Sequence, residues 1–342
     1  MRIDKYLTNK YPNLSRAYIK DQIKLGNFLV YPEQSRGVVK KVKPFYVLRE
    51  SDQVGFTQGF SLPAAAQILP NPAIKLNIIY EDENVIVINK PAGLSVHPRQ
   101  DKNGLPLLQE IDTTLVSGLL AYYPAIASVG DPSTHSTDAQ GGERSRTTSS
   151  GQALLRPGIV HRLDKDTSGV MIIAKNQASF DWLKKQFKER QTIKKYLALV
   201  HGSLKNKEGE IKTLLHRAKK DPTKQKVSKN EGKEAITQYK VLKEYNGYSL
   251  LEASPKTGRL HQIRVHLVHL GHPVMGDTKY GPKPKLDFGL PLKSSFKESE
   301  NPFRQFLHAQ ELEITLLGGP KKTFSAPIPA DLQAILDALE KI

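Results

Sequence analysis

The chain contains no cysteine, one tryptophan and three methionines in 342 residues. The absence of cysteine excludes disulfides, thiol nucleophiles and cysteine-ligated zinc, and it is compatible with a reducing compartment. Acidic residues are also few, because 34 Asp and Glu stand against 51 Lys and Arg, which gives a formal charge of +17. Such an excess is typical of proteins that bind a polyanion, although a solvated basic surface would give the same count.

Long apolar runs are missing as well. Residues 1–7 (M-R-I-D-K-Y-L) have a helical pattern without the apolar segment of a signal peptide, and no run is long enough to span a bilayer. We therefore expect a cytoplasmic protein without a membrane partner. The hydrophobic share of 38% is enough for a sizeable core, and the length predicts roughly two domains.

The most informative stretch, residues 158–175, reads G-I-V-H-R-L-D-K-D-T-S-G-V-M-I-I-A-K. Ile159–Leu163 alternates apolar and polar residues, Val170–Ala174 is apolar, and the residues between them are turn formers. This pattern predicts a β-hairpin. Asp164 would end its first strand, on a rigid element at the rim of the fold, where a substrate could meet it.

Three other interpretations of Asp164 compete with a catalytic one. A turn aspartate often only accepts hydrogen bonds from backbone N–H groups. The D-x-D-x-S-G spacing matches the start of an EF-hand loop, but the bidentate Glu expected at the twelfth position is Lys175, which argues against calcium. An aspartyl-phosphate nucleophile would need phosphate-binding and magnesium-binding segments, and the sequence contains none that we recognise.

The H-R-L-D-K-D-T-S-G run at 161–169 resembles the central motif of the RluA family of pseudouridine synthases, whose R-L-D aspartate is catalytic. Other segments resemble the same family in the expected order: residues 80–98, the K-T-G-R-L-H-Q-I-R-V-H run from Lys256, the G-D-T-K-Y-G run at 276–281 and Q-F-L-H-A at 305–309. The likeness covers nearly the whole chain. Leu260 departs from the family pattern, in which Thr is more usual.

Residues 1–55 resemble the small α-L RNA-binding domain first known from a small-subunit ribosomal protein. The resemblance rests on the R-I-D-K-Y-L, L-S-R-A-Y-I and I-K-L-G-N-F-L-V segments. It implies that Arg16, Lys20 and Lys24, which have helical spacing, bind RNA phosphates. A solvated helix face is the alternative.

Composition divides the remainder into three parts. Residues 56–72, rich in proline and alanine, predict a linker, and residues 73–342 predict the catalytic domain. Within the latter, 130–151 is dominated by Ser, Thr, Gly, Asp and Gln with almost no apolar residues, which predicts a disordered insertion. The lysine-rich stretch 217–233 predicts an exposed loop.

Periodicity and turn signals predict the following elements. Helices are expected over 16–25, 107–123, 178–189, from 262 to about 270, and over 332–339. Strands are expected over 28–30, 76–81, 85–89, 194–202, 235–242 and 249–253. Four histidines near the helix at 262 invite a zinc hypothesis, but their spacing lacks an H-E-x-x-H pair, so we predict no metal.

The family resemblance implies the roles at the site. Asp164 would act at the ribose as nucleophile or base, Tyr196 would stack on the flipped base, and Arg264 would pair with Asp164. The alternatives to these roles are a core position for Tyr196 and a phosphate contact for Arg264. Substrate-binding residues, besides the three of the N-terminal helix, would be Arg162, His161, Arg259, His261 and Gln262.

The fold expected from these observations is α+β. It combines a mixed, largely antiparallel sheet in a catalytic domain of the pseudouridine synthase type with a small N-terminal α-L RNA-binding domain. The reaction implied needs no cofactor. We expect a monomer that modifies RNA, most often large-subunit ribosomal RNA in relatives with this N-terminal module. Transfer RNA is the alternative substrate. The alternative classes of protein are a non-catalytic ribosome-assembly factor and an RNA methyltransferase, and the sequence lacks the G-x-G-x-x-G turn that a methyltransferase would need.

Overall fold

The computed structural model describes most of the chain, in these ranges: 1–11, 16–31, 40–60, 68–99, 107–131, 156–218, 221–282 and 304–341. The chain groups into two compact units, the first formed by residues 1–75 and 97–158, the second by 76–96 and 159–342. This grouping differs from the boundary expected at residue 72, because 97–158 joins the N-terminal segment. The division into an RNA-binding and a catalytic domain therefore stays a prediction.

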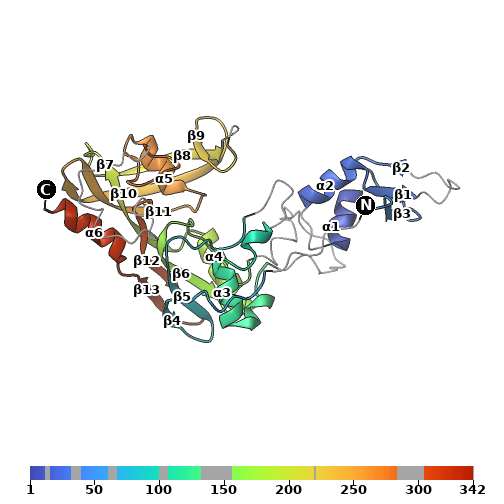
Figure 1. The fold of residues 1–342 in the computed structure, drawn as a ribbon, viewed down its shortest axis with the longest axis horizontal. Helices are drawn as coiled ribbons and strands as arrows, with labels where there is room; N and C mark the ends of the chain where they lie inside the picture. Colours follow the sequence, from blue (N-terminus) through green and yellow to red (C-terminus); the bar gives the residue numbers. More distant parts are fainter. Residues whose placement is uncertain are drawn as a thin grey trace. The chain divides into compact units, whose positions relative to one another are not determined.

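The N-terminal part of the first unit combines two helices with a small sheet (Figure 1). The helices are α1 (Ile3–Lys10) and α2 (Arg16–Leu25), and β1 (Phe28–Tyr31) pairs antiparallel with β2 (Lys40–Lys41) and β3 (Gln53–Phe56). Their apolar faces share one small core, made by Ile3, Leu7, Ile19, Ile23, Phe28 and Val30. The helices and the first strand thus agree with the apolar spacing of the sequence.

The described residues of 97–158 contain three short helical segments. They are η1 (Leu108–Glu110), α3 (Leu115–Tyr122) and η2 (Pro124–Ser128), the first and last being 3₁₀ helices. The helix predicted over 107–123 is present as α3, but it does not extend continuously back to residue 107. Thr114, a residue type that favours the N-cap, starts α3 in an extended conformation and so separates it from η1.

The predicted linker, 56–72, is only partly described, since residues 61–67 lie outside the described ranges. Its C-terminal part is attached to the first unit: the Leu69 N–H donates to the Ile111 carbonyl at 3.0 Å, and Asn71 Nδ2 donates to the Asp112 carbonyl at 2.8 Å. Of the predicted insertion, 130–151, residues 132–151 lie outside the described ranges. Its disorder stays a prediction.

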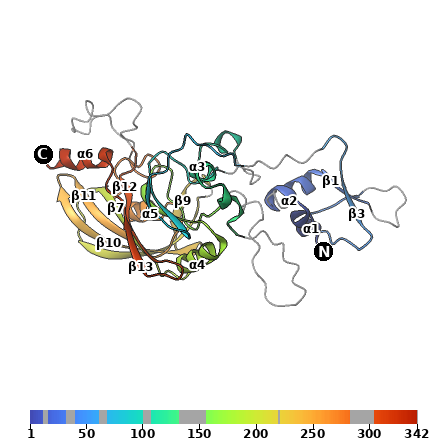
Figure 2. The ribbon, with the colours of Figure 1, turned by 90° about the horizontal axis from the view of Figure 1, so that it is seen from below.

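A sheet of ten strands forms the frame of the second unit (Figures 1 and 2). The strands follow the order β4-β5-β6-β12-β7-β11-β10-β8-β9, with β13 paired to β12. Every neighbouring pair in the described chain is antiparallel except β6 and β12, which are parallel. The expected mixed, largely antiparallel sheet is confirmed.

The strand bounds are, in chain order, β4 Ile78–Glu81, β5 Val85–Lys90, β6 Ser168–Ala174, β7 Ile193–His201, β8 Glu208–Arg217, β9 Gln225–Ser228, β10 Lys233–Tyr245, β11 Tyr248–Pro255, β12 Leu307–Thr315 and β13 Lys321–Ser325. The predicted strands over 76–81, 85–89, 194–202, 235–242 and 249–253 are all present. The lysine-rich stretch 217–233, expected as a loop, contains β9, because the backbone of Gln225–Ser228 pairs antiparallel with β8.

The hairpin predicted for residues 158–175 is only half right. Its second strand is β6, but Ile159–Leu163 makes a single bridge, from Ile159 to Ile173, instead of a ladder. The antiparallel partner of β6 is β5, which lies 79 or more residues earlier in the chain and pairs with it from Gly169 to Ala174. Asp164 therefore lies in a loop leading into β6, not at the end of a strand.

Gly169 allows two strands to approach at the start of β6. Its φ is +118°, and a Cβ atom at this position would lie 2.1 Å from the Ala309 carbonyl oxygen on β12. No side chain fits there, so glycine is required for the parallel contact of β6 with β12. This contact brings the residues just before β12 beside the loop that carries Asp164.

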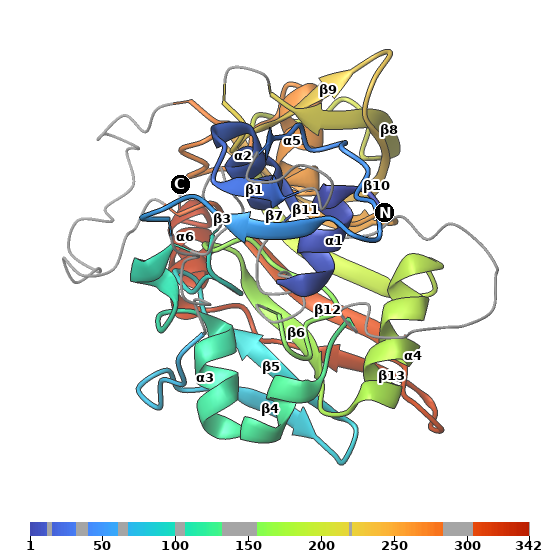
Figure 3. The same cartoon turned by 90° about the vertical axis from the view of Figure 1, so that its right-hand side faces the viewer.

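Three helices cover parts of the sheet. α4 (Gln177–Lys188), capped by the Asn176 side chain, packs beside β6 (Figure 3), and α5 (Gln262–His269) packs against β8 to β11. α6 (Ala330–Leu339) contributes four buried side chains to the core of β7 and β11. In the described ranges, no helix has both the length and the apolar character needed to cross a membrane.

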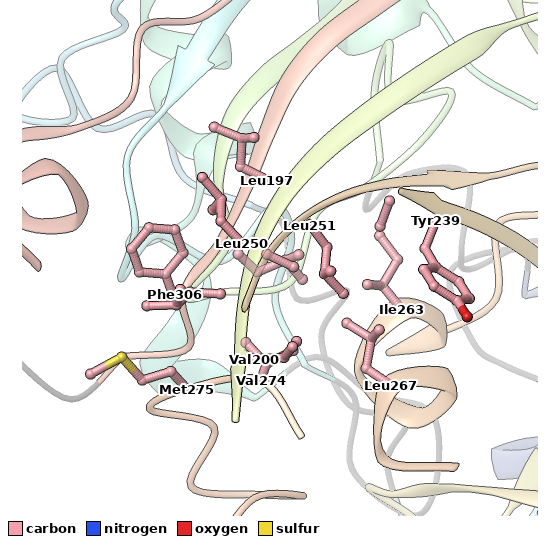
Figure 4. Close-up of a cluster of buried hydrophobic side chains, with 14 of the residues drawn as sticks. Leu197, Val200, Tyr239, Leu250, Leu251, Ile263, Leu267, Val274, Met275 and Phe306 are labelled. Atoms are coloured by element: carbon pink, nitrogen blue, oxygen red, sulfur yellow. The ribbon is translucent and has the colours of Figure 1, made fainter. Parts of the chain in front are cut away.

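The core of the second unit lies on both faces of β7 and β11. Figure 4 shows Leu250 and Leu251, adjacent in β11, pointing to opposite sides, as strand geometry requires. Ile263 of α5 lies beside Leu251, and Phe306 lies on the side of Leu250. Burial on both faces fixes β7, and with it the position of Tyr196, inside the sheet.

Candidate active site

Asp164 lies in a loop that is held by the elements on either side of it. The Thr167 N–H donates to the Asp164 carbonyl at 3.1 Å, which closes a turn. Arg304 Nη1 donates to the Asp166 carbonyl at 3.1 Å, and Gln305 Nε2 donates to Thr167 Oγ1 at 2.6 Å. The loop is thus fixed by the segment that precedes β12, and the Asp164 side chain keeps 16% of its surface exposed.

Lys90, at the end of β5, holds the same loop from the other side. Its fully buried Nζ donates to the carbonyls of Pro91, Leu94 and Lys165 at 2.7, 2.9 and 3.0 Å. Burial lowers the pKa of Lys90 to about 7, while the charges of Asp166 and Asp164 act to raise it. Three close carbonyl acceptors are the environment that an ammonium group prefers, so we assign Lys90 the charged form.

Arg264 connects Asp164 to a second, deeper carboxylate. Its Nη1 donates to Asp164 Oδ2 at 2.9 Å, while Nε and Nη2 donate to the two oxygens of Asp277 at 2.7 and 2.8 Å. The Arg264 side chain is 8% exposed and the Asp277 side chain is fully buried. The bidentate contact fixes the guanidinium plane, and the remaining Nη1 then points at Asp164.

The surroundings of Arg264 and Asp277 favour the charged forms of both side chains. Burial alone would lower the pKa of Arg264, but Asp277 and Asp164 raise it well above its usual value. Burial would raise the pKa of Asp277, but Arg264 and the N–H groups of Tyr280 and Lys279 hold it below its usual range. The guanidinium is therefore charged at neutral pH, and it favours the ionised form of a carboxylate beside it.

Tyr196 stands on β7 between two small neighbours. Its cross-strand partners are Ala253 on β11 and Ala309 on β12. Neighbouring side chains of this register share one face, so the phenol ring is flanked by two methyl groups. Burial, together with the charge of Asp164, raises the pKa of Tyr196 well above its usual value. The phenol is therefore protonated at neutral pH, with the Asp164 charge close enough to influence it.

Two of the predicted substrate-binding residues are occupied inside the fold. Gln262 is buried, and its amide oxygen accepts from Thr257 Oγ1 and the Arg259 N–H, while its nitrogen donates to Thr237 Oγ1 and the Ile236 carbonyl. This corrects its predicted role, since no amide atom of Gln262 is left for a ligand. Its work is to connect the start of α5 to β10.

His161 is the second. Its Nε2 accepts a hydrogen bond from the Ile172 N–H at 3.0 Å, and its ring stacks on Phe187 with centroids 4.6 Å apart. The imidazole takes the place of a backbone acceptor on the edge of β6, where the expected hairpin strand does not continue. His161 Nε2 therefore supports the fold, and the expected substrate contact of His161 stays a prediction.

The other predicted contacts remain near the site. Arg162 is exposed and adjoins Asp164 through Leu163. His261 Nε2 lies 3.9 Å from Asp164 Oδ1. Arg259 Nε donates to the Glu234 carbonyl at 2.9 Å, which leaves its terminal nitrogens without a hydrogen bond to the described protein. His261 therefore lies beside the carboxylate, and although burial lowers the pKa of Arg162, the Asp164 charge acts to raise it.

The three basic residues of α2 have acidic partners. Arg16 Nη2 contacts Asp4 Oδ2 at 2.7 Å, Lys20 Nζ lies 3.9 Å from the same oxygen, and Lys24 pairs with Asp21 at 3.2 Å. Asp4 is fully buried, and although burial would raise its pKa, Arg16 and Arg2 lower it. Arg16 therefore joins α2 to α1. Its side chain is 26% exposed, and those of Lys20 and Lys24 are 40% and 65% exposed, so the phosphate contacts expected of all three stay predictions.

Three functional residues were missed by the sequence analysis: Lys90, Asp277 and Tyr280. All three lie in segments that carried the family resemblance, but their spacing in the sequence did not indicate a chemical role. One argument could have pointed to Asp277. An arginine that pairs with a carboxylate inside the fold needs a second partner to fix the plane of its guanidinium group. Across the described residues, no cluster of three or more His, Asp or Glu side chains is arranged to hold a metal ion.

The buried His266 and the partly buried His161 and His261 predict a marked loss of stability in mild acid. Burial lowers the pKa of His161 to about 3, of His261 to about 4 and of His266 to about 4, from 6.5. Lys194 faces the first; Asp164, Arg264, Lys279 and Asp277 surround the second; His269 faces the third. On acidification these histidines take up protons at a higher pH in the unfolded chain than in the folded one. The free energy of unfolding therefore has its full value above about pH 6.5 and falls toward pH 4.

Each such histidine contributes a slope of up to about 1.4 kcal/mol per pH unit. We expect the melting temperature to fall between pH 7.0 and 5.0. His266→Asn should flatten this dependence, while His269→Asn, at an exposed position on the same helix, should flatten it less, because burial acts first on the His266 pKa and the His269 charge adds to the lowering. An unaltered slope in His266→Asn would contradict the assignment.

Comparison with known proteins gives evidence for the family to which the chain belongs. Residues 84–269 match the family model described as RNA pseudouridylate synthase. The chain is 33% identical over 346 residues to an uncharacterized RNA pseudouridine synthase of Bacillus subtilis, covering 99% of this chain and 94% of that protein. It is 35% identical over 343 residues to ribosomal large subunit pseudouridine synthase D of Xanthomonas campestris pv. campestris, covering 99% and 89%.

Among solved structures, human RNA pseudouridylate synthase domain containing 4 aligns with a TM-score of 0.54 at 25% identity, covering 77% of this chain and 93% of that one. A largely antiparallel sheet with a carboxylate paired to a buried arginine thus occurs here in a chain similar to RNA-modifying isomerases. The chain belongs to the RNA pseudouridylate synthase family. It is an RNA pseudouridine synthase.

Proposed function

We propose that the protein converts uridine to pseudouridine in large-subunit ribosomal RNA, with Asp164 as the reacting carboxylate. The observation that carries the proposal is the arrangement around Arg264, whose bidentate bond to Asp277 aims a third N–H at Asp164. Asp164, Arg264 and Tyr196 thereby act on one another within one unit of the fold, which favours an enzyme over a non-catalytic assembly factor. Relatives named as ribosomal large subunit pseudouridine synthase D support the substrate.

The reaction breaks the N1–C1′ bond of a uridine and joins C1′ to C5 of the same base. N1 gains a proton and C5 loses one, so atoms and charges balance without a redox partner. Asp164 acts at the ribose, as a nucleophile at C1′ or as a base that removes a ribose proton. The uridine must leave the RNA stack to reach it, and the loss of stacking is offset by contacts in the site.

Arg264 donates to Asp164 Oδ2 and so fixes the direction of the carboxylate. Tyr196 offers an aromatic surface on which the flipped base stacks, and its protonated phenol faces the same space without adding negative charge. Arg162, exposed beside Asp164, contacts the RNA around the extruded nucleotide. The N-terminal residues 1–55 form a separate RNA-binding module that adds affinity, and the protein works as a monomer in the cytoplasm.

Tritium release from C5-labelled uridine tests the proposal directly. We expect the wild-type chain to release tritium from a large-subunit ribosomal RNA transcript and not from transfer RNA. Release from transfer RNA alone would overturn the ribosomal assignment, and release from neither would favour the assembly factor. A chain lacking residues 1–55, in the same assay, should show a higher KM with little change in kcat.

A further inference from the structure

Tyr280 connects His261 to a backbone donor at the edge of the site. The Gln225 N–H, at the start of β9, donates to the Tyr280 phenol oxygen at 2.7 Å. The same oxygen lies 2.7 Å from His261 Nδ1. In the described part of the chain these two contacts are the hydrogen bonds of the phenol, and the first uses the oxygen as acceptor. The phenol proton is therefore directed to Nδ1.

This arrangement determines which nitrogen of His261 carries hydrogen. A neutral imidazole has one N–H, and the nitrogen that accepts a hydrogen bond cannot be the protonated one. Because Nδ1 accepts from Tyr280, the hydrogen is on Nε2. That nitrogen is the one that lies 3.9 Å from Asp164 Oδ1, so the N–H faces the oxygen that Arg264 leaves free.

The backbone supports the same orientation. His261 precedes α5 with φ 53° and ψ 21°, a left-handed conformation that residues with a Cβ atom rarely adopt. Tyr280 itself is held in place, because its N–H donates to Asp277 Oδ1 at 3.0 Å and its ring lies under the Arg264 guanidinium, 5.1 Å from centroid to Cζ. Strained conformations of this kind persist where surrounding contacts over-determine them.

We propose that Tyr280 is a positioning residue that holds His261 in the Nε2–H form, so that Asp164 is oriented by Arg264 at one oxygen and by His261 at the other. The inference rests on the proposed role of Asp164. Neither Tyr280 nor Asp277 falls within residues 84–269, the part of the chain that matches the family model. The distance of 3.9 Å is longer than a hydrogen bond, and it shortens when bound RNA excludes water from the site.

Tyr280→Phe removes the hydroxyl and keeps the ring under Arg264. We expect kcat for tritium release to fall by about 10- to 100-fold, the cost of a misplaced catalytic group, with KM within about twofold. Tyr80→Phe is the matched control, because the Tyr80 hydroxyl also donates to one acceptor, Asp82, and accepts from one donor, Lys322, away from the site. Its activity should equal that of wild type.

His261→Gln separates orientation from packing. A glutamine amide nitrogen can occupy the Nε2 position and donate without help from a phenol. This variant should keep more activity than His261→Ala, and adding Tyr280→Phe to it should cause less than about a threefold further loss. Full additivity of the two changes would overturn the proposal.

Imidazole ¹⁵N spectra of histidine-labelled protein give a readout that needs no turnover. The His261 signals, assigned by their loss in His261→Gln, should show a protonated Nε2 in wild type and a mixture of both tautomers in Tyr280→Phe. A single Nε2–H form in both proteins, or a wild-type kcat in Tyr280→Phe, would refute the role of Tyr280. If Asp164→Asn were as active as wild type, the proposed function would fail instead, and the spectra would still decide the tautomer.

Discussion

Replacing Asp164 by Asn should abolish tritium release while leaving RNA binding almost intact. The amide keeps the size of the side chain and can still contact Arg264, but it cannot attack C1′ or accept a ribose proton. We expect kcat to fall by about 10³-fold or more, since the group acts in the chemical step itself. The dissociation constant for RNA should stay within about threefold, a difference of roughly 0.7 kcal/mol.

Asp166→Asn provides the matched control for this experiment. It makes the same chemical change two residues later in the same loop, where the backbone carbonyl of Asp166, and not its side chain, accepts from Arg304. Activity within about threefold of wild type is expected there. A substantial residual rate in Asp164→Asn, measured in single turnover, would show that the reacting carboxylate lies elsewhere.

Arg264→Ala should reduce both activity and stability. Loss of the guanidinium leaves the buried Asp277 carboxylate with the N–H groups of Lys279 and Tyr280 alone. Breaking a buried pair by removing one partner costs about 3–5 kcal/mol, which corresponds to a melting temperature lower by roughly 6–20 °C in a unit of this size. Activity should fall by about 10²-fold or more, because Asp164 loses the group that orients it.

A second substitution separates the two effects of Arg264. Asp277→Asn, added to Arg264→Ala, removes the unpaired charge and should recover part of the lost melting temperature without recovering kcat. Recovery of activity in the double variant would mean that Arg264 served stability alone. Asp277→Asn by itself should lower kcat less than Arg264→Ala does, since Nη1 still reaches Asp164.

Several parts of the fold could be predicted because they depend on neighbours in sequence. The helix Arg16–Leu25, the strands β5 and β7 and the terminal helix follow from apolar spacing, which is a local property. The hairpin before β6 failed for the opposite reason. Ile159–Leu163 has the alternation of a strand, but the antiparallel partner of β6 is β5, so pairing was decided by a distant segment.

The site divides in the same way. Asp164, Tyr196 and Arg264 were placed by resemblance of their motifs, and the pairing of Arg264 with Asp164 is as predicted. Gln262 and His161 belong to the same motifs, yet the Gln262 amide bonds to Thr257 and Thr237, and His161 Nε2 accepts from the Ile172 N–H, inside the fold. A motif cannot distinguish a residue that contacts substrate from one that holds the motif in shape.

By itself, the sequence determined the chemistry that this protein can offer: a basic surface, a chain without thiols, and a motif with one aspartate at its centre. Only the tertiary structure decided which groups surround and orient that aspartate. Arg264 arrives from α5, Asp277 and Tyr280 from the segment after it, and Lys90 from β5, all far from Asp164 in sequence. Charge, tautomer and direction depend on distances of a few ångström, and such distances exist only once the sheet has brought these segments together.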